Sequence, residues 1–398
     1  MLIMAINAGS SSLKWQIFDM PSEERIAKGM IDRLGKQDAI FKASFNGKNF
    51  EKQEPIKTNE KAAALILTRL KSLGIVDHLE DIQGIGHRIV SGGEEFEKST
   101  LVDSKVELQI QNLAELAPLH NPIEAYYINV FQQLLPNAKQ VAVFDTSFYT
   151  TLAPDNYLYP IDKKYYDKYG VRKYGAHGTS HRYVSQRAAT MLKQPLDKTN
   201  LITLHIGSGA SATCIENGKA IDTSMGFTPL AGLMMGTRSG DIDPSTLPYI
   251  MEKEGIDDIG RMISILNHKS GLLGVSGLSN DKRDIDEAAE KGNQRALLAQ
   301  EMFSNRIIKY VGSYMALLKN GTDAIVFTAG VGENDINFRQ NIGDSLKQFG
   351  VEIDPELNKK FNHKEGFINK PDSKIKVMII PTNEELMIVR DTYKLMTK

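Results

Sequence analysis

A pattern of two apolar segments around a turn of small residues occurs near the start of the chain and again in its second half. Short apolar runs separated by Gly, Ser and Asn are typical of β-strands joined by tight turns. Two copies of one such unit predict two related domains that face each other. The strands are predicted at 2–6, 13–19, 201–206 and 212–215, and the turns at 7–12 and 207–211.

Helical segments alternate with further strands along the rest of the chain, and this alternation predicts an α/β fold. The segment 152–175 is rich in Pro, Tyr and Lys and has little periodicity, so we interpret it as the connection between the domains. Asn217-Gly218 predicts a hairpin. Helices are predicted over 59–73, 121–135, 180–192 and 294–319 and from Pro381 onward, and buried strands over 141–144, 324–327 and 375–380.

Composition excludes several classes of protein. The chain of 398 residues has 48 basic and 49 acidic residues and a net charge of −1, which argues against a duplex nucleic acid or an anionic membrane as partner. Its one cysteine, Cys214, excludes a disulfide framework. No apolar run approaches the roughly 18 residues of a membrane span, and apolar residues 2–6 have no basic leader. We therefore expect a cytoplasmic protein.

Three loops of small residues follow predicted strands, at 7–12, 207–211 and 330–334. Glycine and serine let backbone N–H groups approach phosphate oxygens closely, and Lys14 can add a positive charge beside the first loop. The chain has no G-x-x-x-x-G-K-[ST] motif, which excludes a P-loop. Residues 207–212 match G-x-G-x-x-A, but a hairpin rather than a helix is predicted after them, so we interpret the match as accidental.

Two arginines lie where an anion could bind. Arg88 stands between apolar neighbours before a glycine pair, and Arg238 lies on a glycine-rich loop. The guanidinium fork suits a carboxylate or a phosphate, and a buried salt bridge is the alternative for Arg88. Asp145 ends a predicted strand, where functional carboxylates often lie in α/β folds, although an Asx turn would also explain it.

Two histidines and two glutamates flank predicted helices. His177 and His181 suggest a zinc pair only weakly, because neither an H-E-x-x-H motif nor a cysteine partner is present. His177 precedes its helix and can donate to an anion, whereas we interpret His181 as structural. Glu384 and Glu385 begin the last helix, where they either complement the helix dipole or bind Mg²⁺ through water.

Seven segments together resemble the acetate kinase (acetokinase) family, in the family's order and over nearly the whole chain. The resemblance implies the actin-like ATPase superfamily and reversible transfer of the ATP γ-phosphoryl group to acetate. It also implies Mg²⁺, with Mn²⁺ as an alternative, and a homodimer. The segments are Asn7–Lys14 (NAGSSSLK), Ala117–Pro122 (APLHNP), Phe144–Thr146 (FDT), Tyr174–His181 (YGAHGTSH), Asp222–Pro244 (DTSMGFTPLAGLMMGTRSGDIDP), Ala329–Asn334 (AGVGEN) and Pro381–Glu385 (PTNEE).

The resemblance implies two ribonuclease-H-like domains with the active site in the cleft between them. The first covers residues 1–150, with a C-terminal helix at about 384–398 packing back on it. The second covers 151–383, binds the nucleotide and forms the dimer.

The resemblance also assigns roles to single residues. It implies catalytic roles for Asp145, His177 and Arg238, and magnesium binding by Asn7 and Glu384. Arg88, Val90, Leu119 and Pro229 are implied to bind acetate. Nucleotide contacts are implied for Lys14, His205, Ile206, Gly207, Ser208, Gly209, Asp281, Lys282, Arg283, Gly330, Val331, Gly332, Glu333 and Asn334.

Four positions depart from residues found in members of the family. Ser91 and Tyr149 replace histidines, and Ser208 replaces an asparagine of the phosphate turn. Ala176 occupies a site that is phenylalanine in some members, and the smaller residue could admit a longer acyl chain. A propionate or short-chain fatty acid kinase is therefore one alternative. A nucleotide-switched ATPase of the actin-like or chaperone type is another.

Overall fold

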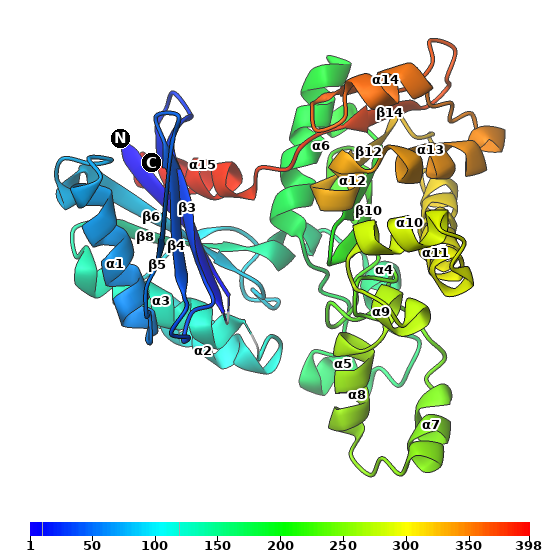
Figure 1. The fold of residues 1–398 in the computed structure, drawn as a ribbon, viewed down its shortest axis with the longest axis horizontal. Helices are drawn as coiled ribbons and strands as arrows, with labels where there is room; N and C mark the ends of the chain where they lie inside the picture. The colour runs from blue at the N-terminus through cyan, green and yellow to red at the C-terminus, as the bar shows by residue number, and fades with distance from the viewer. Residues whose placement is uncertain (10, 119) are drawn as a thin grey trace. The chain divides into compact units, whose positions relative to one another are not determined.

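The computed structural model describes residues 1–9, 11–118 and 120–398. The chain forms two compact units (Figure 1). Unit 1 consists of Met1–Thr150 together with Asn383–Lys398, and unit 2 consists of Thr151–Thr382. Each unit is a mixed β-sheet covered by helices, so the predicted α/β class is confirmed.

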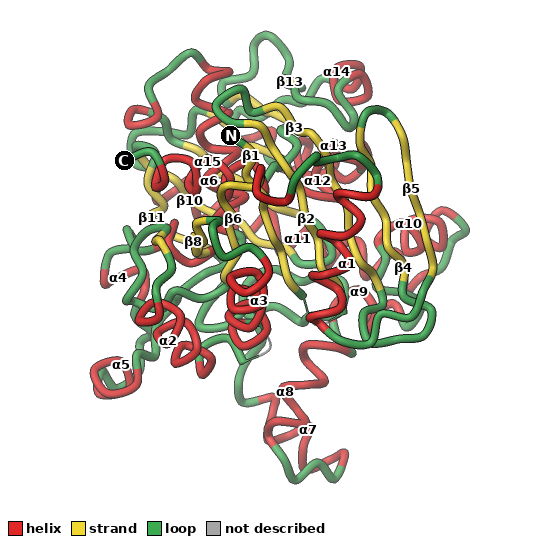
Figure 2. The backbone as a smooth tube through the Cα atoms, turned by 90° about the vertical axis from the view of Figure 1, so that its left-hand side faces the viewer, coloured by secondary structure: helices red, strands yellow, loops and turns green. Residues whose placement is uncertain are grey.

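The sheet of unit 1 has the strand order β5-β4-β3-β2-β1-β6-β8-β7. β1 pairs antiparallel with β2 and parallel with β6, and β6 pairs parallel with β8. The edge strand β5 forms a hairpin with its neighbour β4 (Figure 2). The strands are β1 (Leu2–Ala8), β2 (Ser12–Asp19), β3 (Glu24–Asp32), β4 (Ile40–Phe45), β5 (Lys48–Gln53), β6 (Ile82–Ile89), β7 (Thr100–Leu101) and β8 (Lys139–Phe144).

Helices cover both faces of this sheet. α1 (Asn59–Ser72) and α3 (Asn121–Leu134) pack on one face, where Ile85 of β6 joins their core. Successive side chains of a strand point to opposite faces, so Gly84 and Gly86 lie on the other face. There α15 (Glu384–Met396) packs against β6, β1 and β8. A Cβ at Gly86 would collide with Ile388 of α15, so glycine is what lets this helix approach the sheet.

The sheet of unit 2 has the order β11-β10-β9-β12-β14-β13. β9 and β10 are antiparallel, whereas β9, β12 and β14 run parallel. The hairpin predicted at Asn217-Gly218 joins β10 to β11, with both residues at positive φ. The strands are β9 (Leu201–Ile206), β10 (Ala210–Glu216), β11 (Lys219–Thr223), β12 (Ala324–Thr328), β13 (Gly366–Phe367) and β14 (Lys376–Ile379).

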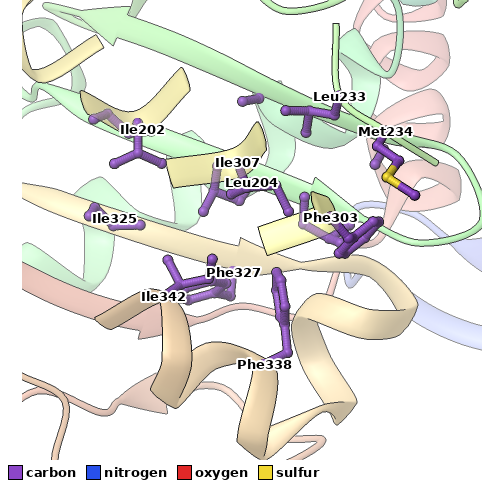
Figure 3. Packing of buried hydrophobic residues seen from close by; sticks show 14 of the residues in the cluster. Ile202, Leu204, Leu233, Met234, Phe303, Ile307, Ile325, Phe327, Phe338 and Ile342 are labelled. Atoms are coloured by element: carbon purple, nitrogen blue, oxygen red, sulfur yellow. The ribbon is translucent and has the colours of Figure 1, made fainter. Parts of the chain in front are cut away.

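Alternation along β9 separates the two faces of this second sheet. Ile202, Leu204 and Ile206 are buried against α11 (Gln294–Leu317) and α13 (Ile336–Ser345), as Figure 3 shows for the first two. Thr203 and His205 lie on the face of α6 (Gly178–Leu192), whose side chains they contact. The apolar face thus packs into the core, and the other face carries the polar side chains of Thr203 and His205, which can form hydrogen bonds.

Two predictions about local structure are corrected. Residues 330–334 do not form a loop but lie in α12 (Ala329–Asn334), because the Glu333 carboxylate accepts a hydrogen bond from the N–H of Ala329 at 2.8 Å and closes the first turn. The segment 152–175 belongs to unit 2 and contains two short helices. The remaining helices are α2 (Ser104–Asn112), α4 (Pro154–Tyr157), α5 (Lys164–Tyr169), α7 (Thr246–Glu254), α8 (Ile259–His268), α9 (Gly271–Ser276), α10 (Lys282–Glu290) and α14 (Pro355–Lys360).

None of the helices in the described part of the chain combines the length and the apolar character that crossing a bilayer requires.

Candidate active site

Four of the predicted site residues meet in unit 1 around the guanidinium of Arg88. Its Nε and Nη2 donate to Oδ2 of Asp145 at 3.0 and 2.6 Å, and Nη1 donates to Oδ1 of Asn7 at 3.3 Å. Glu384 Oε2 lies 3.9 Å from Nε. The Arg88 side chain is 18% exposed and that of Asp145 is 1% exposed. This cluster combines one cation with two carboxylates and one amide.

The fold explains why residues so distant in sequence meet. Asn7, Arg88 and Asp145 lie at or just beyond the carboxyl ends of β1, β6 and β8, which are neighbouring parallel strands. Side chains at the carboxyl ends of parallel strands gather at one edge of the sheet, where α/β proteins bind ligands. Glu384 joins them because α15 begins there.

Charge interactions keep the Arg88 guanidinium protonated. Burial by itself would lower the pKa of Arg88, but the carboxylates of Asp145 and Glu384 raise it above its usual value. Burial also raises the pKa of Glu384 to about 7, with Arg88 and Lys14 acting in the opposite direction. The exposed Lys14 of β2 therefore contributes to the potential at this cluster.

The oxygen atoms of this cluster suit a magnesium ion. Asn7 supplies an amide oxygen and Glu384 a carboxylate, both within reach of one guanidinium. Mg²⁺ prefers oxygen ligands and keeps several waters, and it is usually held by one or two carboxylates together with substrate phosphates. No cluster of three or more His, Cys, Asp or Glu side chains suited to a metal occurs among residues 1–9, 11–118 and 120–398. The donor set fits an ion held largely by water and phosphate.

The apolar residues predicted to bind acetate are distributed over the chain. Val90 follows β6 in unit 1 and is 8% exposed. Pro229 belongs to unit 2 and is partly buried. Leu119 lies outside the described residues. Ala176 is buried in the core of unit 2.

A second group of predicted residues meets in unit 2. His177 precedes α6 with a positive φ of 59°, and its ring stacks on that of His205 with centroids 4.1 Å apart. A Cβ at Gly209 would lie 3.5 Å from the His177 ring and 3.7 Å from Nη1 of Arg238. The turn after β9 thus lies close to both an imidazole and a guanidinium.

Arg238 differs from Arg88 in its partners. Its Nη1 donates to the carbonyl oxygen of Pro229 at 3.4 Å and contacts Sδ of Met235 at 3.7 Å. Burial lowers the pKa of Arg238, and no carboxylate among the described residues forms an ion pair with it. A partly buried guanidinium without a carboxylate is suited to receive an anion from a substrate.

Hydroxyl groups that the sequence analysis did not identify hold the histidines in place. Ser211 Oγ lies 2.8 Å from Nδ1 of His177 and 2.8 Å from Nε2 of His181. The other nitrogen of His181 lies 2.7 Å from Oγ1 of Thr203, and burial lowers its pKa well below the usual value. With both nitrogens engaged and the ring neutral, His181 is structural, as predicted. No motif in the sequence predicted that Ser211 of β10 and Thr203 of β9 would hydrogen-bond to these histidines.

A cavity of about 870 Å³ lies beside the turn in unit 2. Of the residues predicted to contact a nucleotide, the cavity is lined by Gly207, Ser208, Asp281, Lys282, Arg283, Gly330, Val331 and Asn334. The cavity is not lined by five other predicted residues, which are His205, Ile206, Gly209, Gly332 and Glu333. Lining residues that the sequence analysis did not identify are Leu272, Asn280, Asp286, Glu287, Glu290, Phe303, Asp335, Ile336, Asn337 and His363.

The cations of this cavity are already paired. Lys282 Nζ donates to Asp286 at 2.6 Å and to Asp335 at 2.9 Å, and its side chain is 10% exposed. Arg283 pairs with Asp281 at 2.5 Å. The part of the cavity around Lys282 and Arg283 therefore offers a phosphate group no unpaired lysine or arginine among the described residues. The carboxylates there can accept hydrogen bonds from hydroxyl groups.

The Glu333 side chain serves the fold rather than the cavity. Its Oε1 accepts hydrogen bonds from the N–H groups of Ala329 at 2.8 Å and Thr382 at 3.0 Å. Thr382 is the last residue of unit 2 before α15, and its Oγ1 lies 2.7 Å from Oγ of Ser180. Glu333 thus ties α12 to the segment that leads into α15.

We expect Glu333→Ala to lower the free energy of unfolding by about 1–3 kcal/mol, because two backbone donors lose their acceptor. Glu333→Gln keeps an acceptor oxygen and should retain most of the stability. Denaturant unfolding of both variants measures the difference. Equal stability of Glu333→Ala and the unmodified chain would show that the two hydrogen bonds contribute nothing.

Comparisons with known proteins identify the class of the chain as a kinase. The family model described as Acetokinase family matches residues 2–390. "Acetate kinase 1" of Latilactobacillus sakei is 57% identical over 394 residues, which cover 99% of each chain. "Acetate kinase" of Lacticaseibacillus paracasei is 54% identical with the same coverage. The chain belongs to the acetokinase family.

Solved structures agree with this assignment. The crystal structure of Porphyromonas gingivalis acetate kinase has a TM-score of 0.94 and 42% sequence identity and covers 99% of each chain. That of a propionate kinase from Francisella tularensis has a TM-score of 0.93 and 41% identity with equal coverage. The predicted two-domain fold of the actin-like ATPase superfamily is therefore confirmed.

Proposed function

We propose that the protein is an acetate kinase that transfers the γ-phosphoryl group of ATP directly to acetate and forms acetyl phosphate and ADP in a reversible reaction. The observation that carries this proposal is Arg238, a partly buried guanidinium that is not paired with a carboxylate among the described residues. It lies beside the turn at Gly209 and shares that turn with His177. Such a group is suited to an anion that arrives with the substrate.

The distribution of charge suggests how ATP is oriented. The end of the cavity around Asp281 and Asp286 holds paired cations and carboxylates, which suits the neutral nucleoside with its ribose hydroxyls. The phosphates then extend along Gly207 and Gly330 toward Arg238. This orientation places the γ-phosphoryl group at the group of residues that can neutralise it.

The proposed chemistry needs positioning and charge neutralisation rather than a strong base. An oxygen of the ionised acetate attacks the γ-phosphorus, a new O–P bond forms, and the bond to the β,γ-bridging oxygen breaks with its electron pair passing to ADP. Acetate carries no proton to remove, so Asp145 acts by aligning Arg88 and the bound reactants. Arg88 holds the carboxylate, while His177 and Arg238 stabilise the charge on the transferring group.

Asn7 and Glu384 are the residues that would hold Mg²⁺. When bound, the ion supplies charge neutralisation to the phosphate oxygens. Oδ1 of Asn7 lies 3.3 Å from Nη1 of Arg88 and Oε2 of Glu384 lies 3.9 Å from its Nε, so both oxygen atoms lie beside the same guanidinium.

A homodimer and a cytoplasmic location belong to the same proposal. Both are supported by the resemblance to the family, and the charge balance of the chain supports the absence of nucleic acid and membrane partners.

Acetate should be preferred over propionate, with measurable activity on both. One extra methylene group changes transition-state binding by about 1–3 kcal/mol, which corresponds to roughly 10- to 200-fold in kcat/KM. Steady-state kinetics with acetate, propionate and butyrate measures this ratio. A preference for butyrate would contradict the assignment of acetate as substrate.

Trapping with hydroxylamine tests the proposed reaction. Hydroxylamine converts acetyl phosphate to acetohydroxamate, which a ferric salt makes visible. We expect hydroxamate to form only when ATP, Mg²⁺ and acetate are all present. Hydrolysis of ATP at the same rate with and without acetate, and without hydroxamate, would instead indicate a nucleotide-switched ATPase.

A further inference from the structure

Glu124 of α3 is a buried carboxyl group in unit 1 that the proposed reaction does not use. The residue is 2% exposed, and its Oε2 accepts a hydrogen bond from the backbone N–H of Val90 at 2.9 Å. Its Oε1 is buried without a hydrogen-bond partner among the described residues. A buried carboxyl group is costly, so its position against Val90 calls for a physical reason.

The backbone after β6 is held by side chains rather than by a neighbouring strand. Asn121, one turn before Glu124, accepts a hydrogen bond from the N–H of Ser91 at 3.1 Å and donates to its carbonyl oxygen at 2.9 Å. Thr146 Oγ1 accepts from the N–H of Gly92 at 2.9 Å. Buried N–H groups that leave a sheet need such acceptors. Glu124 provides the one at Val90.

The charge state of Glu124 matters for its neighbour Arg88. Burial raises the pKa of Glu124 to about 8, while Arg88 and the Val90 N–H lower it and Asp145 raises it. A largely neutral Glu124 at pH 7 satisfies the backbone of Val90 without adding another negative charge beside Arg88. The positive potential of Arg88 then remains for a substrate carboxylate.

We propose that Glu124 is a positioning residue for acetate, which fixes the backbone at Val90 and through it the depth of the pocket that admits a two-carbon acid. This inference rests on the proposed assignment of Arg88 and Val90 to acetate. Glu124 is 2% exposed and holds the backbone N–H of Val90, so it acts through Val90. Its expected effect is on the affinity and selectivity for the acid and not on ATP.

Two variants separate the hydrogen bond from the charge. Glu124→Gln keeps the acceptor oxygen without a charge and should leave the KM for acetate within about twofold. Glu124→Leu has a similar volume but no acceptor, and we expect it to raise the KM for acetate roughly tenfold or more and to reduce the acetate-to-propionate ratio of kcat/KM. The KM for ATP should stay within about twofold in both. Glu124→Ala replaces the leucine variant if that variant does not fold.

Matched controls make the outcome decisive. Gln133→Ala, an exposed position on the same helix, should leave the kinetics unchanged, and thermal unfolding reports any loss of stability separately. If Glu124→Leu left the acetate KM and the selectivity unchanged while Val90→Ala shifted selectivity toward propionate, the proposed role of Glu124 would be refuted. The proposed acetate pocket at Val90 would stand. Unchanged selectivity in Val90→Ala would overturn the proposed acetate pocket itself. A loss of activity in Glu124→Gln as large as in Glu124→Leu would contradict the claim that an uncharged acceptor oxygen is sufficient at position 124.

Discussion

Arg238→Ala should lower kcat for the transfer of phosphate to acetate by on the order of a hundredfold or more. The guanidinium has no carboxylate partner to release within the described chain, so its removal should cost little stability. The effect should appear mainly in kcat, because Arg238 is not among the residues that line the cavity proposed to bind the nucleoside. Steady-state kinetics measures kcat. The dissociation constant for ADP measures nucleotide affinity, which should change little.

Arg261→Ala is the matched control for Arg238→Ala. Arg261 is an exposed arginine of α8 in the same unit, and its removal changes the net charge equally. We expect normal turnover in the control. Near-normal turnover in Arg238→Ala would refute its role at the transferring phosphoryl group. An equal loss of turnover in both variants would show that the loss comes from the change in net charge.

Arg88→Ala should impair both folding and activity. Removing one partner of a buried ion pair costs about 3–5 kcal/mol, and Asp145, whose side chain is 1% exposed in the intact protein, would lose its guanidinium partner. The KM for acetate should rise strongly as well, since the proposed partner of its carboxylate is lost. Denaturant unfolding measures the first effect, and kinetics with saturating ATP measures the second.

Arg88→Lys and Asp145→Asn distinguish the two effects of Arg88→Ala. Lysine retains the charge but cannot bind Asp145 and a carboxylate as a planar fork, so stability should recover more than acetate affinity. Asp145→Asn removes the ion pair and keeps the Arg88 charge, so acetate affinity should suffer less than in Arg88→Ala. Wild-type acetate affinity in Arg88→Ala would exclude Arg88 from the acetate site.

Local patterns in the sequence predicted those parts of the fold that local physics determines. The strands around 2–19 and 201–215 follow from apolar runs and small-residue turns, and the Asn217-Gly218 hairpin follows from residues that adopt positive φ. The segment 330–334 was predicted as a loop because of its glycines. It is helical because Glu333 provides an acceptor inside the fold, which a glycine pattern does not reveal.

Motifs predicted which residues belong to the candidate site, but not how these residues pair with one another. Arg88 and Asp145 each had a functional and a structural interpretation, and the structure shows them as an ion pair at the end of neighbouring strands. Lys282 pairs with Asp335, 53 positions away, so its charge is not free for a phosphate. Glu124 was predicted only as part of the helix start at Asn121, and its contact with Val90 was not predicted. Such contacts depend on tertiary packing, which one sequence does not encode in a local pattern.

Direct transfer from ATP to acetate predicts a particular stereochemical course at phosphorus. ATP with a γ-phosphoryl group made chiral by oxygen isotopes, together with acetate, yields acetyl phosphate whose configuration can be determined. A single in-line displacement, with Arg88 on the acid and Arg238 on the phosphoryl group, predicts inversion. Retention of configuration would show that a side chain is phosphorylated on the way and would contradict direct transfer.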